Sequence, residues 1–291
     1  MSVLTRAGDL RSGRTPFVMA TVVRAERPTS AKPGDRALVL PDGSMEGFVG
    51  GTCAESTVRV QGLRLLRTGR STLLRITPTA QDETVGDGLV TVGNPCLSGG
   101  SLDIFLEAVL PPMLVHVYGE APVARALVEV GRALGHEVRQ ITGPAEACPA
   151  DLSALVVASH GRDEETVLHR AVQAGVPYIG LVASPKRGRA VLASLDLTDG
   201  QRARLHTPAG LDIGARTPPE IALSIYAEVV SLRPERDRDE PAPARTDAVD
   251  PVCGMTVAVG EHALSLRHNE TTVYFCGPGC RAAFADNPSR Y

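Results

Sequence analysis

Three cysteines near the end of the chain have the spacing of a soft-metal site. Cys276 and Cys280 lie four positions apart, so a helix would place both sulfurs on one face, and Cys253 arrives from a turn. Disulfide pairing would leave one of the three thiols over, whereas thiolates are preferred ligands of Zn or Cu. The spacing predicts a metal site, with His262 and His268 as candidates for a fourth ligand. The alternative is a set of buried, unliganded cysteines that pack like small apolar side chains.

A fourth cysteine is preceded by two glycines. Gly50 and Gly51 stand before Thr52 and Cys53, and Thr52 and Glu55 have the spacing of a capping box. We therefore expect a helix to begin here, with Cys53 in its first turn, where the positive end of the helix dipole favours a thiolate. The glycines leave room for another molecule to approach the sulfur. The sequence predicts a functional thiol at Cys53, and a packing cysteine is the alternative.

A second glycine-rich loop of the same region also carries a cysteine. It contains Cys96, Ser98, Gly99 and Gly100 and precedes a predicted strand at 101–110. Two such loops suggest one ligand cleft that Cys53 and Cys96 share. Two unrelated turns are the alternative.

Composition limits the classes of protein to consider. The 291 residues carry a net charge of -3 and no Trp, which gives no reason to expect nucleic-acid binding. No apolar run reaches the length of a membrane helix, residues 1–13 do not resemble a signal peptide, and the scattered thiols fit a reducing cytoplasm. Residues 233–246 contain no large apolar side chain, which predicts a linker.

Apolar strands and helices alternate between residues 111 and 232. Such alternation predicts a parallel sheet covered by helices on both faces, a Rossmann-like α/β domain. Thr217 and Glu220 have capping-box spacing at the start of its last helix. The predicted strands are 113–118, 136–141, 154–158 and 176–182, and the helices are 122–134, 164–174, 187–195 and 219–232. For residues 1–110 we expect a small α+β domain with strands at 17–24, 36–40, 45–49 and 101–110.

The first strand-to-helix turn of the Rossmann-like domain departs from the dinucleotide fingerprint. Gly119 is the one glycine of the expected pattern, and Glu120 puts negative charge where phosphate oxygens would lie. The acidic residue that binds ribose is absent from 139–143. We therefore expect a structural turn and no nicotinamide cofactor.

Other loops at the carboxyl ends of the predicted strands carry polar side chains. Ligands of open α/β sheets bind at this edge, and cations near a helix start suit a phosphate. A solvated helix start is the alternative. The candidate residues are His160, Ser184, Lys186, Arg187 and Asp212.

Residues 249–291 resemble the YHS domain family. The family opens on Asp-Pro-Val-Cys-Gly-Met and has a Tyr-x-Phe-Cys-x-x-x-Cys-x-x-x-Phe core, whereas Tyr274 directly precedes Phe275 in this chain. The matching residues are Asp250, Pro251, Val252, Cys253, Gly254 and Met255, followed by Tyr274, Phe275, Cys276, Cys280 and Phe284.

Residues 15–232 resemble the XdhC/CoxI family of accessory proteins for molybdenum hydroxylases. The resemblance rests on Pro41-Asp42-Gly43-Ser44, Gly50-Gly51-x-Cys53-x-Glu55, Pro95-Cys96-Leu97-Ser98-Gly99-Gly100 and Gly210-Leu211-Asp212-Ile213-Gly214. The Pro-Cys-Leu-Ser-Gly-Gly form favours the carbon monoxide dehydrogenase branch. The domains implied are 1–110 and 111–232 for this family, 233–248 as a linker, and 249–291 for the YHS domain.

The resemblance implies that this protein is a maturation factor for an enzyme and is not itself the enzyme. Such a protein binds molybdenum cofactor, as molybdopterin or its cytosine dinucleotide form, supports its sulfuration and delivers it to an apo-hydroxylase of the xanthine or CO dehydrogenase type. Cys53 would contribute to cofactor binding with Cys96 as a second contact, and Lys186 and Arg187 would suit its phosphate. A cysteine desulfurase and a second copy of the chain are further expected partners. A thiol-dependent oxidoreductase and a metal or thiol sensor are the alternative functions.

Overall fold

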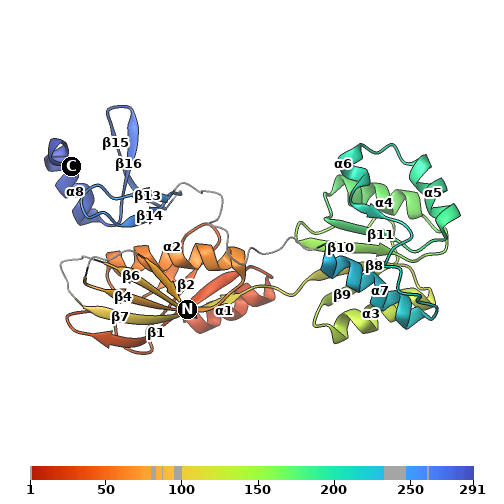
Figure 1. Cartoon of the computed structure of the whole chain (residues 1–291), viewed down its shortest axis with the longest axis horizontal. Helices are drawn as coiled ribbons and strands as arrows, with labels where there is room; N and C mark the ends of the chain where they lie inside the picture. Colours follow the sequence, from red (N-terminus) through yellow and green to blue (C-terminus); the bar gives the residue numbers. More distant parts are fainter. Residues whose placement is uncertain (1, 80–82, 87, 95–99, 233–246, 261) are drawn as a thin grey trace. The chain divides into compact units, whose positions relative to one another are not determined.

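Two compact units make up the chain (Figure 1). The computed structural model describes residues 2–79, 83–86, 88–94, 100–232, 247–260 and 262–291. One unit combines Met1–Pro111 with Glu235–Tyr291, and the other is Pro112–Pro234. Each has a sheet and a core of its own.

A seven-stranded sheet in the order β3-β2-β1-β7-β4-β6-β5 forms the frame of the first unit. In β1, Phe17 and Met19 pack with buried side chains of α1, whereas Val18, Ala20 and Val22 pack with those of α2. Alternate side chains of a strand point to opposite faces, so α1 and α2 cover opposite faces of the sheet. The elements are α1 (Val3–Ser12), β1 (Phe17–Glu26), β2 (Arg36–Val39), β3 (Met45–Gly47), α2 (Thr52–Thr68), β4 (Thr72–Thr77), β5 (Thr84–Gly86), β6 (Leu89–Gly93) and β7 (Ser101–Val109).

The second unit holds a parallel five-stranded sheet in the order β12-β11-β10-β8-β9. Helices α3 and α7 share one core with it, and α4 and α5 contribute to the core on its other face. The predicted Rossmann-like architecture is confirmed. The elements are β8 (Leu114–Tyr118), α3 (Pro122–Ala133), β9 (Glu137–Ile141), β10 (Leu152–Val157), α4 (Glu164–Gln173), β11 (Tyr178–Leu181), α5 (Pro185–Ser194), α6 (Asp199–Arg202), β12 (Leu205–His206) and α7 (Pro218–Ser231).

Gly119 has a structural role in the first turn of this sheet. Its φ is +114°, and a Cβ at this position would lie 2.8 Å from the carbonyl carbon of Ala158. The turn therefore packs directly on the end of β10, where no side chain fits. The glycine serves close packing between strands, as we expected of a structural turn.

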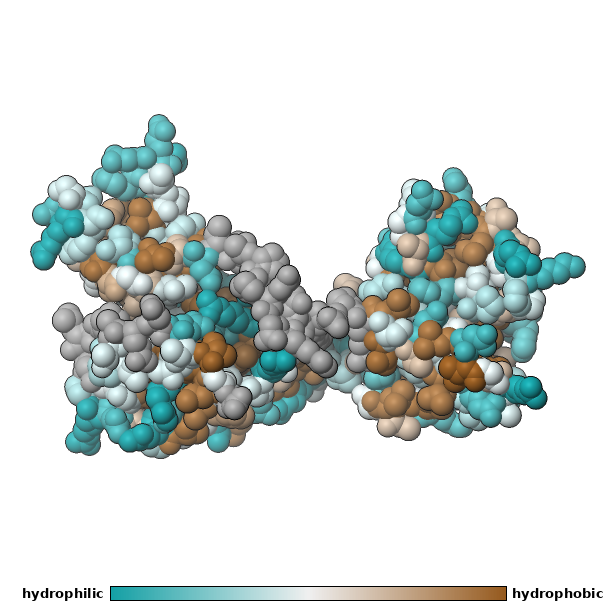
Figure 2. Space-filling view, viewed as in Figure 1, coloured by the Kyte–Doolittle hydropathy of each residue, from teal (hydrophilic) through white to brown (hydrophobic). Residues whose placement is uncertain are grey.

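Apolar side chains remain on the surface of the second unit. Figure 2 shows apolar surface on the part of this unit that carries α3 and α7. Leu134, Leu223 and Val230 are about half exposed. Grouped apolar surface of this kind is typical of contact with another protein.

The C-terminal segment belongs to the first unit and has small strand pairs of its own. It comprises two antiparallel strand pairs, β13 (Asp247–Val249) with β14 (Thr256–Ala258) and β15 (Leu264–His268) with β16 (Thr271–Phe275), followed by α8 (Pro278–Asp286). Strand β14 packs on α2. Among the described residues, no helix combines the length and apolarity needed to span a membrane.

Candidate functional site

Helix α2 begins one residue earlier than the capping-box spacing predicts. Gly51 is the N-cap, with no side-chain cap, and Thr52 is the first helical residue. The prediction of Thr52 as the cap is therefore wrong, because the extended backbone of Gly51 already accepts the first helical hydrogen bond, from the Glu55 N–H. Cys53 does lie in the first turn, as predicted, and is half-buried.

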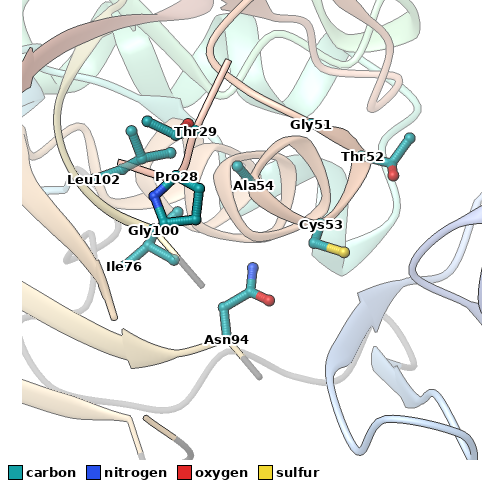
Figure 3. Close-up of a pocket in the computed structure, with 10 residues that line it drawn as sticks. All are labelled: Pro28, Thr29, Gly51, Thr52, Cys53, Ala54, Ile76, Asn94, Gly100 and Leu102. Carbon is teal, nitrogen blue, oxygen red and sulfur yellow. The ribbon is translucent and has the colours of Figure 1, made fainter. Parts of the chain in front are cut away.

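Cys53 lines a cavity of about 170 Å³ at this helix start. Figure 3 shows Cys53 on one side of the cavity and the apolar side chains of Ile76 and Leu102 on the other. Pockets for drug-sized ligands have roughly 300–1,000 Å³, so a large ligand would insert one end here and protrude. The lining residues are Pro28, Thr29, Gly51, Thr52, Cys53, Ala54, Ile76, Asn94, Gly100 and Leu102.

Not all of the predicted residues near Cys53 line the cavity. Gly100 lines it, and a Cβ there would lie 2.7 Å from the Glu26 carbonyl oxygen, so the strand can approach only as glycine. Gly50 has a φ of +134° and allows the chain to turn into α2. Glu55 is half-buried in the same helical turn and is not among the lining residues just given.

The remaining predicted members of the second loop, Cys96, Ser98 and Gly99, lie outside the described residues. Asn94, directly before that loop, lines the cavity and is buried. The sequence motifs did not single out the Asn94 side chain as a site residue, although its amide stands directly before the Pro-Cys pair.

The three C-terminal cysteines meet, but not on one helical face. The sulfur of Cys276 lies 3.5 Å from that of Cys253 and 3.6 Å from that of Cys280. Cys276 comes between β16 and α8, and only Cys280 belongs to the helix, because Pro278 starts it after Cys276. The expectation of two sulfurs four apart on one helix is corrected to one from a strand end and one from a first helical turn.

Asp250 is the residue that sequence reasoning missed in this cluster. It is fully buried, and its ligating oxygen and the three sulfurs lie within 4.8 Å of one another. Its Oδ1 accepts from the Val252 N–H at 2.9 Å, and its Oδ2 accepts from the Cys276 N–H at 2.8 Å. Burial alone would raise the pKa of Asp250, but these backbone donors lower it below the ordinary value.

Neither predicted histidine joins the cluster. His262 is about half exposed, with Nε2 3.7 Å from Asp42 Oδ2. His268 lies beside Asn269 and meets the ring of Phe284 edge-on. Asp250, in contrast, could have been predicted as a member of the cluster from the sequence, because it stands three residues before Cys253 in the turn that leads into the site.

In the second unit, Arg187 is held by a buried carboxylate. Glu164 is 4% exposed and accepts from the Gly161 N–H at 2.8 Å, from the Ser159 hydroxyl at 3.1 Å and from the Arg187 guanidinium. Ser184 caps α5 by accepting from the Arg187 N–H. Arg187 therefore ties two strand-end loops together, and its charge already has a partner.

Three other predicted residues of this unit, His160, Lys186 and Asp212, are exposed. His160 has a φ of +55° in the loop after β10, and Lys186 stands in the first turn of α5. Asp212 lies in a loop that is anchored beside it, since the Gly210 N–H donates to Glu228 at 2.8 Å.

Taken together, these features define a two-unit α/β protein with a half-buried cysteine at a cavity of its first unit and a Rossmann-like second unit that lacks the dinucleotide fingerprint. Two family profiles match it: the XdhC and CoxI family over residues 10–77 and the XdhC Rossmann domain over residues 115–229. The chain belongs to the XdhC family, which confirms the resemblance found in its motifs.

Three curated proteins are similar to the chain. The uncharacterized protein YqeB of Escherichia coli is 28% identical over 80% of this chain. The match covers 46% of the length of YqeB, so the chain spans about half of that protein. A probable xanthine dehydrogenase component of Bacillus subtilis is 31% identical over 28% of this chain and 23% of that protein. The molybdenum cofactor insertion chaperone PaoD of Escherichia coli is 22% identical over 78% of this chain and 86% of that protein.

Proposed function

We propose that this protein binds molybdenum cofactor as cargo, supports its sulfuration and delivers it to an apo-hydroxylase of the xanthine or CO dehydrogenase type. In this role the protein acts as a carrier of the cofactor. The similarity to a cofactor insertion chaperone over most of both chains supports this role. The observation that carries the proposal is the Cys53 thiol at the start of α2, facing a cavity.

The thiol suits one end of such a cargo. A thiolate is a soft ligand for molybdenum or for an activated sulfur, and the start of α2 favours negative charge there. The cavity of about 170 Å³ would take the metal end of the cofactor, and the remainder would protrude. Asn94 offers an amide at the same cavity.

The second unit, taken by itself, also offers a cation to an anionic ligand. Arg187 is neutralised by Glu164, so exposed Lys186 at the start of α5 is the better candidate in this unit for binding a phosphate group. Of the two cations that the sequence suggested for a phosphate, Lys186 is therefore the proposed binding residue, and Arg187 has a structural role.

Cofactor retention tests the proposal. The full chain is incubated with molybdenum cofactor and gel-filtered, and the bound pterin is released by acid and measured by its fluorescence. We expect Cys53→Ser to lose most of the bound pterin. Cys148→Ser is the matched control, because Cys148 is a half-buried thiol that packs against the core of the other unit, and it should retain pterin like the parent. Equal retention by both variants would remove Cys53 from the site.

A further inference from the structure

The C-terminal segment lies directly on the candidate thiol site of the first unit. Cys53 packs against a small core formed by Met255, Val257 and Cys276. A Cβ at Gly277 would lie 3.2 Å from the Thr52 hydroxyl, so the backbone of the segment closely approaches the start of α2. Farther along α2, Arg64 forms an ion pair with Asp247 at 3.3 Å. The C-terminal segment thus contacts α2 near both ends of this helix.

The sulfurs of the cluster are spaced for one tetrahedral ion. With a Zn–S distance of about 2.3 Å, the edge of a tetrahedron of thiolates is about 3.8 Å. The two sulfur–sulfur distances in the structure, 3.5 and 3.6 Å, are close to this edge. The Cys53 thiol is in turn a hydrogen-bond partner of the Cys276 thiol. The Cys53 side chain of α2 therefore contacts this group of three sulfurs at Cys276.

Asp250 competes with Cys53 as the fourth ligand, since its oxygen and the three sulfurs lie within 4.8 Å of one another, but its carboxylate also has a second role. Both of its oxygens accept backbone N–H groups, one beside Cys253 and one on Cys276, so the carboxylate fixes the loops that carry these sulfurs. Such a residue orients metal ligands without binding the metal itself. The sulfur of Cys53 is a softer donor than the carboxylate oxygens of Asp250, and it matches the other three ligands.

We propose that Cys53 completes a four-thiolate Zn²⁺ site with Cys253, Cys276 and Cys280. Four thiolates in a tetrahedron suit Zn²⁺, which releases the thiol protons on binding. Because the segment belongs to the same chain, its docking is intramolecular and is favoured by a high effective concentration. Zn²⁺ at this site would occupy the sulfur that faces the cavity, so metal and cofactor would exclude each other at Cys53. This last consequence rests on the proposed function, whereas the metal site does not.

Cobalt substitution counts the thiolates. The full chain is titrated with Co²⁺, whose thiolate charge-transfer absorption grows with each sulfur ligand. We expect Cys53→Ser to lose about a quarter of this absorption, since three thiolates remain of four. Cys148→Ser should match the parent. Asp250→Asn should keep the full absorption but weaken metal affinity by roughly 10–100-fold, as loss of an orienting residue does. Absorption in Cys53→Ser equal to that of the parent would overturn the proposal, because it would mean that Cys53 is not among the sulfur ligands.

A second measurement needs no substitution in the site. Alkylation of the parent chain is followed at Cys53 by mass spectrometry, with and without saturating Zn²⁺. We expect Zn²⁺ to slow labelling of Cys53 at least tenfold and to leave Cys148 unchanged, and chelation should restore it. Labelling of Cys53 at the same rate with Zn²⁺ bound would refute a shared site. Neither readout involves molybdenum, so failure of cofactor binding alone would leave this site intact and would refute the carrier role separately.

Discussion

Replacing Gly119 by Ala tests whether the first turn of the Rossmann-like sheet is structural. Two costs add at this position. The φ of +114° is unfavourable for an L side chain, by about 1–2 kcal/mol. The added Cβ would also meet the backbone of Ala158 at 2.8 Å, and forcing atoms into a packed interior costs roughly 1–3 kcal/mol more. We expect the free energy of unfolding of this unit to fall by about 2–5 kcal/mol.

Gly135→Ala is the matched control for this change. Gly135 also has a positive φ, +77°, but a Cβ there would meet no atom within 4 Å. It should lose only the conformational cost of about 1–2 kcal/mol. Urea unfolding followed by tyrosine fluorescence reports this unit, because three of the five tyrosines, Tyr118, Tyr178 and Tyr226, lie in it and the chain has no Trp. If Gly119→Ala is no more destabilising than Gly135→Ala, the close-packing argument is wrong.

Three further results are expected. Burial lowers the pKa of His116, whose ring nitrogens have no hydrogen-bond partner among the described residues. The unfolded state therefore binds a proton more readily, and the free energy of unfolding falls as pH drops below about 6.5. In His116→Leu the urea midpoint should depend less on pH between 7.5 and 5, and an unchanged pH dependence would contradict this. Glu164→Gln should destabilise the second unit by about 1–3 kcal/mol in the same assay, because Arg187 loses its charged partner, whereas exposed Glu165→Gln should change little. NADH should show no micromolar binding by calorimetry, and such binding would mean that the turn at Gly119 accepts a dinucleotide.

Local patterns were sufficient for much of the fold. The capping box of Thr217 and Glu220 forms as predicted, because its partners are three residues apart and little else competes for them. The apolar runs of β8, β10 and β11 predicted a parallel sheet, since both of its faces are covered. Helix α1 was missed because only Ala7 and Leu10 are buried, which leaves no clear apolar stripe.

Long-range contacts were the part that sequence reasoning could not supply. Arg187 reads as a cation near a helix start, but a carboxylate 23 positions earlier neutralises it. Asp250 reads as a polar residue before a turn, and only folding brings it to the Cys276 backbone. The same holds for Cys53 and the C-terminal cysteines, whose proximity depends on how the C-terminal segment packs on α2.

Transfer of cofactor to a client enzyme tests the carrier role most directly. Purified protein loaded with molybdenum cofactor is mixed with an apo-hydroxylase of the xanthine or CO dehydrogenase type, and the rate at which hydroxylase activity appears is compared with that of the unassisted cofactor. The account predicts faster activation by the parent chain and by Cys148→Ser, and a rate near the unassisted one for a folded Cys53→Ser. Activation by Cys53→Ser at the parent rate would contradict the central role of this thiol.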